Sequence, residues 1–361
     1  MSDKHDTALH LAAKAAMMTG TLAAVGLGSQ WAKAAPAPET LPSGERITAG
    51  EATIVRNGQR MVIEQGTNRL ITNWQDFSIG AKAQVEFVQP SASSAALNRV
   101  TSGKPSEIFG SLSANGQVML VNQAGIHLAD GSRVDAGSFV ASTLDIADQD
   151  FLEGRMRFAG GAAAGSIIAE GDINVAEGGY VALIAPTIEQ RGRIEAVSGD
   201  VALAAASESV EVTLGDTGLV SLKVEREDLD SAIAQGEASR LGEGAVILNA
   251  EGFDSLTRGV VNNTGYIEAS GLESEGGRIV LRADDKISSS GTIAAQSVNA
   301  AGGEIVFDAG RSAELSGMLD VSSASGEAGQ ITVEADKIAL TDTARVDATG
   351  TSGGGDVLIG G

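Results

Sequence analysis

The sequence contains few side chains that could build a reactive centre. It has no cysteine, which excludes thiol nucleophiles, cysteine zinc sites and disulfides. Of its three histidines, only His127 lies beyond the first ten residues, between Ile126 and Leu128. Strand alternation would turn His127 away from these apolar neighbours and toward solvent, where a lone imidazole lacks the further ligands of a metal site. We therefore predict no enzyme activity, no metal site and no cofactor.

Carboxylates are abundant, since the chain has 47 Asp and Glu residues. Enzymes that cleave polysaccharides use two carboxylates on one face, which makes the neighbouring Asp284 and Asp285 candidates. Adjacent strand positions point to opposite faces, so two solvated acids are the better prediction. The run Gly353–Gly361 is similar to calcium-binding repeats, but those repeats act in tandem and this run occurs once. A polysaccharide-acting enzyme stays an alternative, which an outward groove lined by acids would favour.

The composition limits both fold and partners. The formal charge of −22 argues against a nucleic-acid partner and suits a protein that must stay soluble outside a cell. A hydrophobic fraction of 43% is enough to fill a core. The core must consist largely of small and β-branched side chains, since the chain has only two Trp, two Tyr and eight Phe residues. This composition favours pleated sheet over a helical bundle.

Residues 1–34 have the pattern of a secretory signal peptide. Lys4 and Lys14 precede the apolar stretch Ala15–Leu27, and Ala32-Lys-Ala34 supplies a small-residue cleavage pattern. The apolar stretch is too short to anchor the protein in a membrane. We therefore expect an exported protein.

A glycine-led apolar motif recurs through the rest of the chain. The second residue after the glycine is always Val or Ile, the fourth is a large apolar residue, and the sixth is usually Ala. Gly277, Gly303, Gly329 and Gly355 follow one another at intervals of 26 residues. This alternation predicts strands. The copies are Gly116–Asn122, Gly179–Ala185, Gly199–Ala205, Gly244–Ala250, Gly277–Ala283, Gly303–Ala309, Gly329–Ala335 and Gly355–Gly361.

Such a unit cannot bury its own apolar face, but stacked units form a continuous core. We predict an all-β fold, a right-handed parallel β-helix, rather than an antiparallel sandwich. The reason is that the copies of the motif recur without hairpin turns between most of them. The pattern lapses over 206–243, which predicts a small excursion from the helix. Residues 36–70 are expected to cap the first coil, whose unpaired edges would otherwise promote aggregation.

The N-terminal third carries short motifs in a specific order. They run from Trp74-Gln-Asp-Phe-Ser-Ile-Gly80 through Leu97-Asn-Arg-Val100 and Asn122-Gln-Ala-Gly125 to Val140-Ala-Ser-Thr-Leu-Asp145. In this order they resemble the secretion domain of two-partner-secreted exoproteins, the filamentous haemagglutinin family, and most closely its high-molecular-weight adhesin branch. The resemblance implies recognition by a dedicated outer-membrane transporter, passage in extended form and folding at the cell surface.

Six residues of these motifs are candidates for contact with the transporter or for coil corners, and both roles stay open. The family often has Asn-Pro-Asn-Gly where this chain has Asn122-Gln-Ala-Gly125, and the matching glycine can preserve the turn. Asn122 occupies the column that elsewhere holds Ala, so we expect it to point inward at a bend and to bond to backbone. The six candidates are Asn98, Arg99, Asn115, Gly116, Asn122 and Gly125.

The chain is thus predicted to have three parts. These are the signal peptide over 1–34, the cap and signature coils over 35–160, and the repeated coils over 161–361. The expected function is that of the secretion domain of an adhesin-like exoprotein, carried through the periplasm to the outer-membrane surface. The repeat stops within a column at Gly361, which predicts a C-terminal extension that reaches a host-cell or glycan target. The stalk of a contact-dependent toxin is a further alternative.

Overall fold

The computed structural model describes residues 35–160, 164–197, 199–206, 209–215, 218–224, 238–241, 245–248, 260–270 and 277–360. The chain divides into two compact units, residues 1–34 and 35–361. The predicted signal peptide lies outside the described residues, as does part of the predicted excursion over 206–243. In the described part, no helix is long and apolar enough to cross a membrane.

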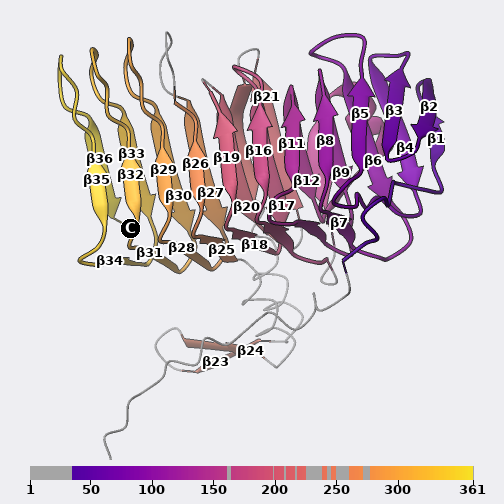
Figure 1. Cartoon of the computed structure of the whole chain (residues 1–361). Helices are drawn as coiled ribbons and strands as arrows, with labels where there is room; N and C mark the ends of the chain where they lie inside the picture. Colours follow the sequence, from indigo (N-terminus) through magenta and orange to yellow (C-terminus); the bar gives the residue numbers. More distant parts are fainter. Residues whose placement is uncertain are drawn as a thin grey trace, which may run out of the picture. The chain divides into compact units, whose positions relative to one another are not determined.

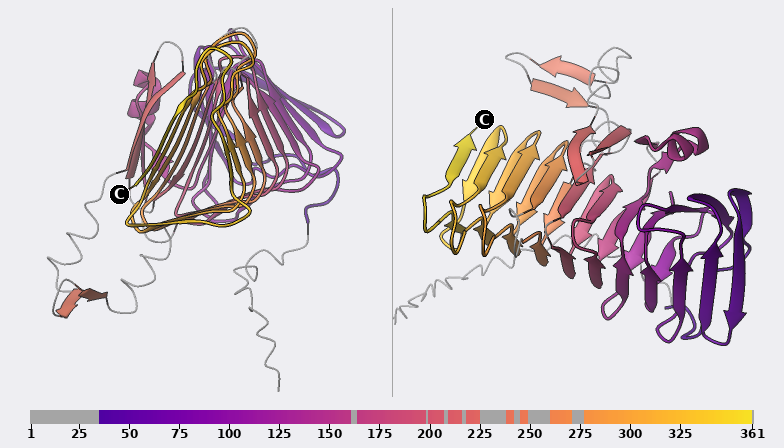
Figure 2. Two further views of the ribbon diagram at one scale, coloured as in Figure 1. Left: turned by 90° about the vertical axis from the view of Figure 1, so that its left-hand side faces the viewer. Right: turned by 90° about the horizontal axis from the view of Figure 1, so that it is seen from above.

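Three long sheets form the sides of the second unit, and neighbouring strands in each sheet come from successive coils (Figure 1). Viewed along the stack, the coils have a three-sided outline (Figure 2, left). Sheet 1 contains β1 (Arg46–Ala49), β4 (Arg69–Trp74), β6 (Ala95–Val100), β9 (Gln117–Val121), β12 (Ser138–Ser142), β17 (Tyr180–Ala185), β20 (Asp200–Ala205), β27 (Arg278–Ala283), β30 (Glu304–Ala309), β33 (Gln330–Glu334) and β36 (Asp356–Gly360). Sheet 2 contains β7 (Ser106–Ile108), β10 (Ile126–Leu128), β15 (Ile167–Ala169), β18 (Thr187–Gln190), β25 (Val260–Asn263), β28 (Lys286–Ser289), β31 (Ser312–Leu315) and β34 (Lys337–Leu340). Sheet 3 contains β2 (Ala52–Asn57), β3 (Arg60–Gln65), β5 (Gln84–Val88), β8 (Ser111–Ala114), β11 (Arg133–Ala136), β16 (Asp172–Val175), β19 (Arg193–Ala196), β26 (Tyr266–Glu268), β29 (Thr292–Ala294), β32 (Met318–Asp320) and β35 (Arg345–Asp347).

The register follows the repeat that the sequence predicts. Ile279 is the partner of Ile305, and Ile305 is the partner of Ile331, in parallel strands of sheet 1. All three side chains are fully buried in one apolar cluster that fills the interior of the coils. The prediction of a parallel β-helix is therefore confirmed.

The glycines that precede the sheet 1 strands are required by close approach of the backbone. A Cβ atom on Gly199 would lie 2.0 Å from the carbonyl oxygen of Gly179, and one on Gly277 would lie 1.8 Å from that of Gly199. Real Cβ atoms never approach a carbonyl oxygen this closely, so any side chain here would push successive coils apart. This explains why the repeat begins with glycine in every coil from Gly179 onward.

The N-terminal end of the stack is closed by strands of opposite direction. The strand β1 pairs antiparallel with β4, and β2 pairs antiparallel with β3. The next pairs, β3 with β5 and β4 with β6, are parallel and belong to the coils. The capping strands are thus the N-terminal part of the predicted range 36–70, and the first coil begins inside that range.

Two excursions leave the stack at the same corner, after a strand of sheet 1 and before one of sheet 2. The first contains β13 (Asp145–Ile146), α1 (Asp148–Glu153) and β14 (Met156–Ala159). The second contains β21 (Ser209–Gly215) and β22 (Gly218–Val224). They combine in one antiparallel sheet, in the order β13-β14-β21-β22. The prediction included only the second excursion.

The excursion sheet and α1 lie against the outer face of sheet 1 (Figure 2). Phe151, Met156 and Phe158 pack there in a second apolar cluster with residues of sheet 1. Ala182 and Ile184 belong to this outer cluster, whereas Val181 and Leu183 belong to the inner one. Strand β17 is therefore buried on both faces.

One predicted repeat does not belong to the β-helix. The segment Gly244–Ala250 was expected to form a strand of the coils, but β24 (Ala245–Leu248) pairs antiparallel with β23 (Ala238–Leu241) in a separate two-stranded sheet. In sheet 1, β20 pairs directly with β27. The local alternation was sufficient for a strand, but it did not specify the partner of that strand.

Candidate functional site

Asn115 and Gly116 form the corner between β8 and β9. The backbone N–H of Gln89 in the preceding coil donates to Asn115 Oδ1 at 2.7 Å, and Asn115 Nδ2 donates back to the Gln89 carbonyl at 2.8 Å. The Asn115 side chain thus continues the sheet pairing where the backbone turns away. Asn115 itself is exposed.

The side chain of Gln89 connects this corner to the coils on both sides. Its amide nitrogen donates to Gln65 Oε1 and to the carbonyls of Ser94 and Gln117, at 3.1 to 3.2 Å. Its Oε1 accepts from the N–H of Gly116 at 2.9 Å. A Cβ atom on Gly116 would lie 2.8 Å from the same oxygen, so glycine is needed at this position. Gln89 is buried, and the sequence analysis had not identified its role.

Asn98 points into the interior of the coil. It is fully buried, and its Oδ1 accepts a 3.0 Å hydrogen bond from Nε1 of Trp74 in the preceding coil. An indole N–H buried without an acceptor would cost about 1–3 kcal/mol. Asn98 therefore stabilises the packing of a large aromatic side chain in the first coil.

Asn122 and Gly125 form the corner between β9 and β10. Asn122 is buried, and its Nδ2 donates to the Lys104 carbonyl and to Ser106 Oγ, both at 2.9 Å. Its Oδ1 accepts from the N–H of Ala124 at 3.0 Å. Gly125 has φ 119°, a conformation that favours glycine. The turn thus persists without the Asn-Pro-Asn-Gly motif.

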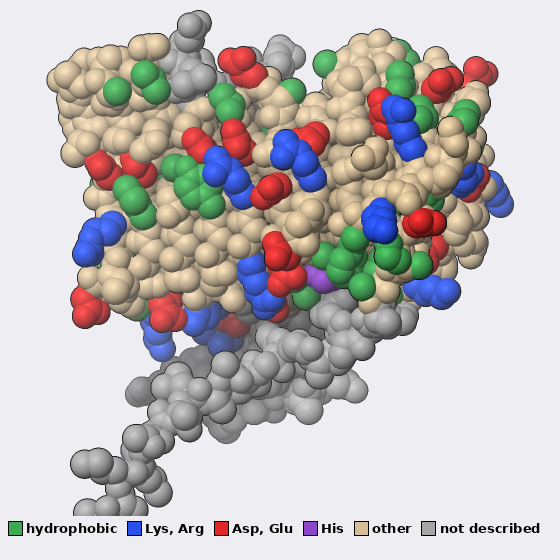
Figure 3. Space-filling model, viewed as in Figure 1, with side chains coloured by type: hydrophobic (Ala, Val, Ile, Leu, Met, Phe, Trp, Pro, Cys, Tyr) green, Lys and Arg blue, Asp and Glu red, His purple; other side chains and the backbone are tan. Residues whose placement is uncertain are grey.

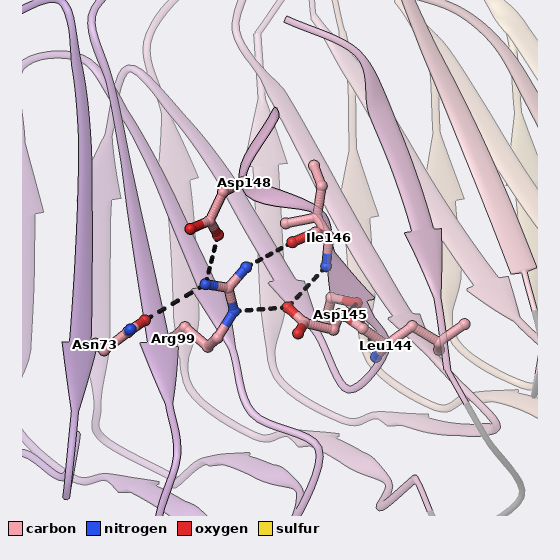
Figure 4. Close-up of polar contacts among 7 residues, drawn as sticks. Asn73, Arg99, Leu144, Asp145, Ile146 and Asp148 are labelled. Carbon is pink, nitrogen blue, oxygen red and sulfur yellow. Dashed lines mark hydrogen bonds and ion pairs between the residues drawn. The ribbon is translucent and has the colours of Figure 1, made fainter. Parts of the chain in front are cut away.

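Arg99 points outward from β6 and holds the first excursion against sheet 1 (Figure 4). Its Nε lies 2.8 Å from Asp145 Oδ1, its Nη1 lies 2.7 Å from Asp148 Oδ1, and its Nη2 donates to the Ile146 carbonyl at 2.5 Å. The side chain is 15% exposed. Burial would lower the pKa of Arg99, but the two carboxylates outweigh it and raise that pKa, so the charge is retained.

The six candidates lie at several places in successive coils rather than on one surface. Asn98, Gly116, Asn122 and Gly125 are buried, Arg99 is half-buried, and Asn115 is exposed. Each makes contacts that hold its own coil to a neighbouring coil or to the excursion. In the folded protein, only Asn115 and part of Arg99 can be reached from outside.

A groove of about 310 Å³ lies at the corner between sheets 3 and 1, beside Asn115. Its polar lining residues are Asn115, Asp135 and Asn174. Asp135 is already bound to Arg133 at 2.5 Å and accepts from Asn174 at 3.2 Å. With one carboxylate in its lining, the groove lacks the carboxylate pair of a polysaccharide-cleaving site.

His127 is on the outward side of β10, as expected, but it is not a lone exposed side chain. Its Nδ1 lies 3.0 Å from Glu107 Oε2 and its Nε2 lies 3.0 Å from Glu170 Oε2, and the ring is 15% exposed. Figure 3 shows its purple side chain among neighbouring acidic and apolar groups. Because Glu107 and His127 are register partners in sheet 2, alignment of these short strands could have revealed the contact.

The acids Asp284 and Asp285 lie in the bend between β27 and β28 rather than in a strand, and their exposure differs. Asp284 is exposed, whereas Asp285 is buried and lies 3.0 Å from Arg311 Nε. The prediction of two solvated acids is therefore wrong for Asp285, whose pKa is raised because burial outweighs the nearby cations. Within the described ranges, no group of three or more His, Asp and Glu side chains could hold a metal ion.

Comparison with known proteins gives one consistent family. The model of the TPS secretion domain family matches residues 39–295. Two curated relatives from Haemophilus influenzae, both named heme/hemopexin-binding protein, are 29% identical over 252 residues and 26% identical over 265 residues. Each match covers 68% of this chain but only 27% or 28% of the relative, so the chain spans about a quarter of their length.

The fold is also found among solved structures. The secretion domain of HMW1 from Haemophilus influenzae has a TM-score of 0.60 to this chain at 21% identity. The match covers 88% of this chain and 94% of that domain. The two chains thus share the β-helical fold along most of their length.

Proposed function

Because this chain belongs to the family of TPS secretion domains, the secretion domains of two-partner exoproteins, we propose that its transporter reads the segment Asn98–Gly125 before the β-helix forms. Family membership implies a cognate outer-membrane transporter. The burial of Asn98, Gly116, Asn122 and Gly125 supports the proposal, because these residues are accessible to a partner only before the coils form. Folding then buries the segment, so that the transporter can no longer bind it and the chain passes in one direction only.

Folding after passage is consistent with the chemistry of the chain. Without cysteine, no disulfide can lock the protein in the oxidising periplasm. Coil-by-coil stacking lets folding propagate from the end that emerges first. We further infer that residues 1–34 direct export into the periplasm. Sequencing of the secreted protein from its N-terminus should then begin at Ala35.

The test compares two buried asparagines. Asn122 lies at the corner before sheet 2, and its Nδ2 donates to the hydroxyl of Ser106 in the neighbouring coil. Asn263 lies at the corner after sheet 2, and its Nδ2 donates in the same way to the hydroxyl of Ser289. Asn122→Ala and Asn263→Ala should destabilise the folded domain to a similar extent. Only Asn122→Ala should reduce secretion when the cognate outer-membrane transporter is co-expressed, because Asn263 lies outside the proposed segment.

Equal secretion defects in the two variants would contradict recognition and leave a purely structural role for Asn122. Both purified variants are also refolded and monitored by circular dichroism. This measurement shows whether a secretion defect comes from lost recognition or from a failure to fold. Asn115→Ala provides a second test, since its side chain is exposed and its loss should affect secretion more than stability.

The adhesin-like role, the surface location and a host-cell or glycan target belong to the same proposal. The two relatives are named for binding heme or hemopexin, but the matches cover about a quarter of each. The shared property that we infer is therefore export. The alternatives of a polysaccharide-acting enzyme and a toxin stalk have no comparable support from the groove or the corners.

A further inference from the structure

His127 joins three successive strands of sheet 2. Glu107 lies on β7, His127 on β10, and Glu170 directly follows β15. The two glutamates contact opposite ring nitrogens, each at 3.0 Å. Arg191, which follows β18, adds a cation to this row, since it binds Glu170 at 2.8 Å and also Glu189. The Phe109 ring stands edge-on to the imidazole, 5.6 Å between centroids.

This geometry requires a protonated imidazole. A neutral imidazole has one N–H donor and one acceptor nitrogen, whereas an imidazolium has two donors. Glu107 and Glu170, which lie against the two ring nitrogens, are carboxylates, and an ionised carboxylate only accepts. When the ring loses its proton, one of the two bonds is replaced by repulsion between a ring lone pair and a carboxylate oxygen.

The electrostatic environment agrees with the geometry. Burial would lower the pKa of His127, but the hydrogen bonds and charges of Glu107 and Glu170 outweigh it and raise that pKa. The pKa of Glu170 is lowered, first by its hydrogen bond to His127 and further by Arg191. Both shifts favour the protonated imidazole between two ionised carboxylates.

The cluster lies where the β-helix resumes after an interruption. The chain leaves sheet 1 after β12, makes the first excursion, and re-enters the stack at β15. There it must pair with β10, in the register Ile126 with Ile167 and Leu128 with Ala169. Strand β15 is three residues long and is apolar on both faces, since Ile168 also is buried. The alternation of apolar and polar residues therefore does not specify which face of β15 should point inward.

We propose that His127 is a pH-sensitive latch that holds the returning strand β15 on β10. A group with a raised pKa in the folded state contributes its full stabilisation below the unfolded pKa, about 6.5. The contribution is lost as the pH rises through the folded value. The latch is thus closed in acidic conditions and opens as the pH rises through the raised pKa of His127.

Hydrogen exchange of the full chain at pH 5.5 and pH 8.5, corrected for intrinsic rates, tests the latch. Amides of β10 and β15 should lose protection at the higher pH, because the bonds of His127 to Glu107 and Glu170 weaken when the ring loses its proton. Amides of β28 and β31 should not change, because these two strands of the same sheet contain no histidine. His127→Gln should remove the pH difference at β10 and β15.

The proposal is overturned if β10 and β15 are equally protected at both pH values. It is also overturned if their loss of protection persists in His127→Gln, or if all three sheets lose protection together. A titration of the His127 ring by NMR tests the latch in the unmodified protein, without any variant. A midpoint at or below about 6.5 excludes the latch.

Discussion

Sheet 1 has two regions with the same backbone and different surroundings. In β17, all six residues from Tyr180 to Ala185 are buried. In β30, buried and half-buried residues alternate from Glu304 to Ala309. The excursion sheet covers the first region on its outer face, whereas in β30 the outward residues stay half-buried and Val306 packs at the edge of the outer cluster. The covered region therefore has two apolar faces and the uncovered region has one.

The comparison shows how a β-helix acquires a second core. The excursion strand β14 pairs with β13 from its own excursion and with β21 from the next one, so the cover is complete only when both have folded. The uncovered coils need only their direct neighbours. Stability in the covered region should thus depend on contacts between distant parts of the sequence, and in the uncovered region on local stacking.

The largest expected effect compares two buried phenylalanines. Phe158 lies in the cover and Phe307 in the interior of an uncovered coil, and both are fully buried. Phe158→Ala and Phe307→Ala should each lower the free energy of unfolding by about 4 kcal/mol, because each removes a large ring and leaves a cavity. Urea denaturation followed by circular dichroism measures both. A loss below about 1 kcal/mol for Phe158→Ala would mean that the cover is not part of the cooperative fold.

The next effect concerns the glycines between coils. Gly199→Ala should cost about 3 kcal/mol, because its Cβ atom would meet the Gly179 carbonyl and both neighbouring coils are fixed. Gly355→Ala makes the same contact with Gly329 in the last described coil, which can shift more freely, so it should cost less. Gly354→Ala is the control, since its nearest neighbour would be 3.8 Å away. Equal losses for Gly199 and Gly355 would contradict this difference.

A smaller effect distinguishes the charged contacts of the two regions. Arg99→Gln should cost about 2 kcal/mol, because it leaves Asp145 and the Ile146 carbonyl without their charged donor. Arg282→Gln removes the pair between Arg282 and Asp308 of β27 and β30, where the arginine side chain is 29% exposed against 15% for Arg99, and should cost about 0.5 kcal/mol. Denaturation at low and high salt checks both, and the reverse order would refute the role of Arg99 as an anchor.

The last comparison concerns the C-terminal end of the described coils. Val357 is 42% exposed in β36, whereas Val333 is fully buried in β33. Val333→Ala should therefore cost about 2 kcal/mol and Val357→Ala less than about 1 kcal/mol. Equal losses by thermal denaturation would indicate that another surface covers Val357 in solution.

The stack itself could be predicted from the sequence because its signals are periodic. Columns such as Ile279, Ile305 and Ile331 recur at one interval, and glycine marks each close approach. The corner at Asn122 and Gly125 follows from local turn chemistry. These features depend on neighbours in the same or the adjacent coil.

The cover and its anchor could not be predicted in this way. The partners of Arg99 lie on an excursion that interrupts the period, and β14 and β21 pair across two intervening coils. Alternation also misassigned Gly244–Ala250, because a hairpin strand and a coil strand have the same pattern. The sequence did contain one signal of the cover, however. The unbroken apolar run Tyr180–Ala185 indicates a strand with no solvent-exposed face.

The identical junctions of the uncovered coils limit how the molecule can change in length. Removal of residues 303–328 would join Gly302 to Gly329 and would place Ile331 on Ile279 with the same carbonyl-to-glycine contact as before. A deletion of any other size would turn apolar side chains outward or place a Cβ atom against a carbonyl. Over evolution, this part of the protein should therefore lengthen or shorten by whole turns of 26 residues, while the covered part keeps a fixed size.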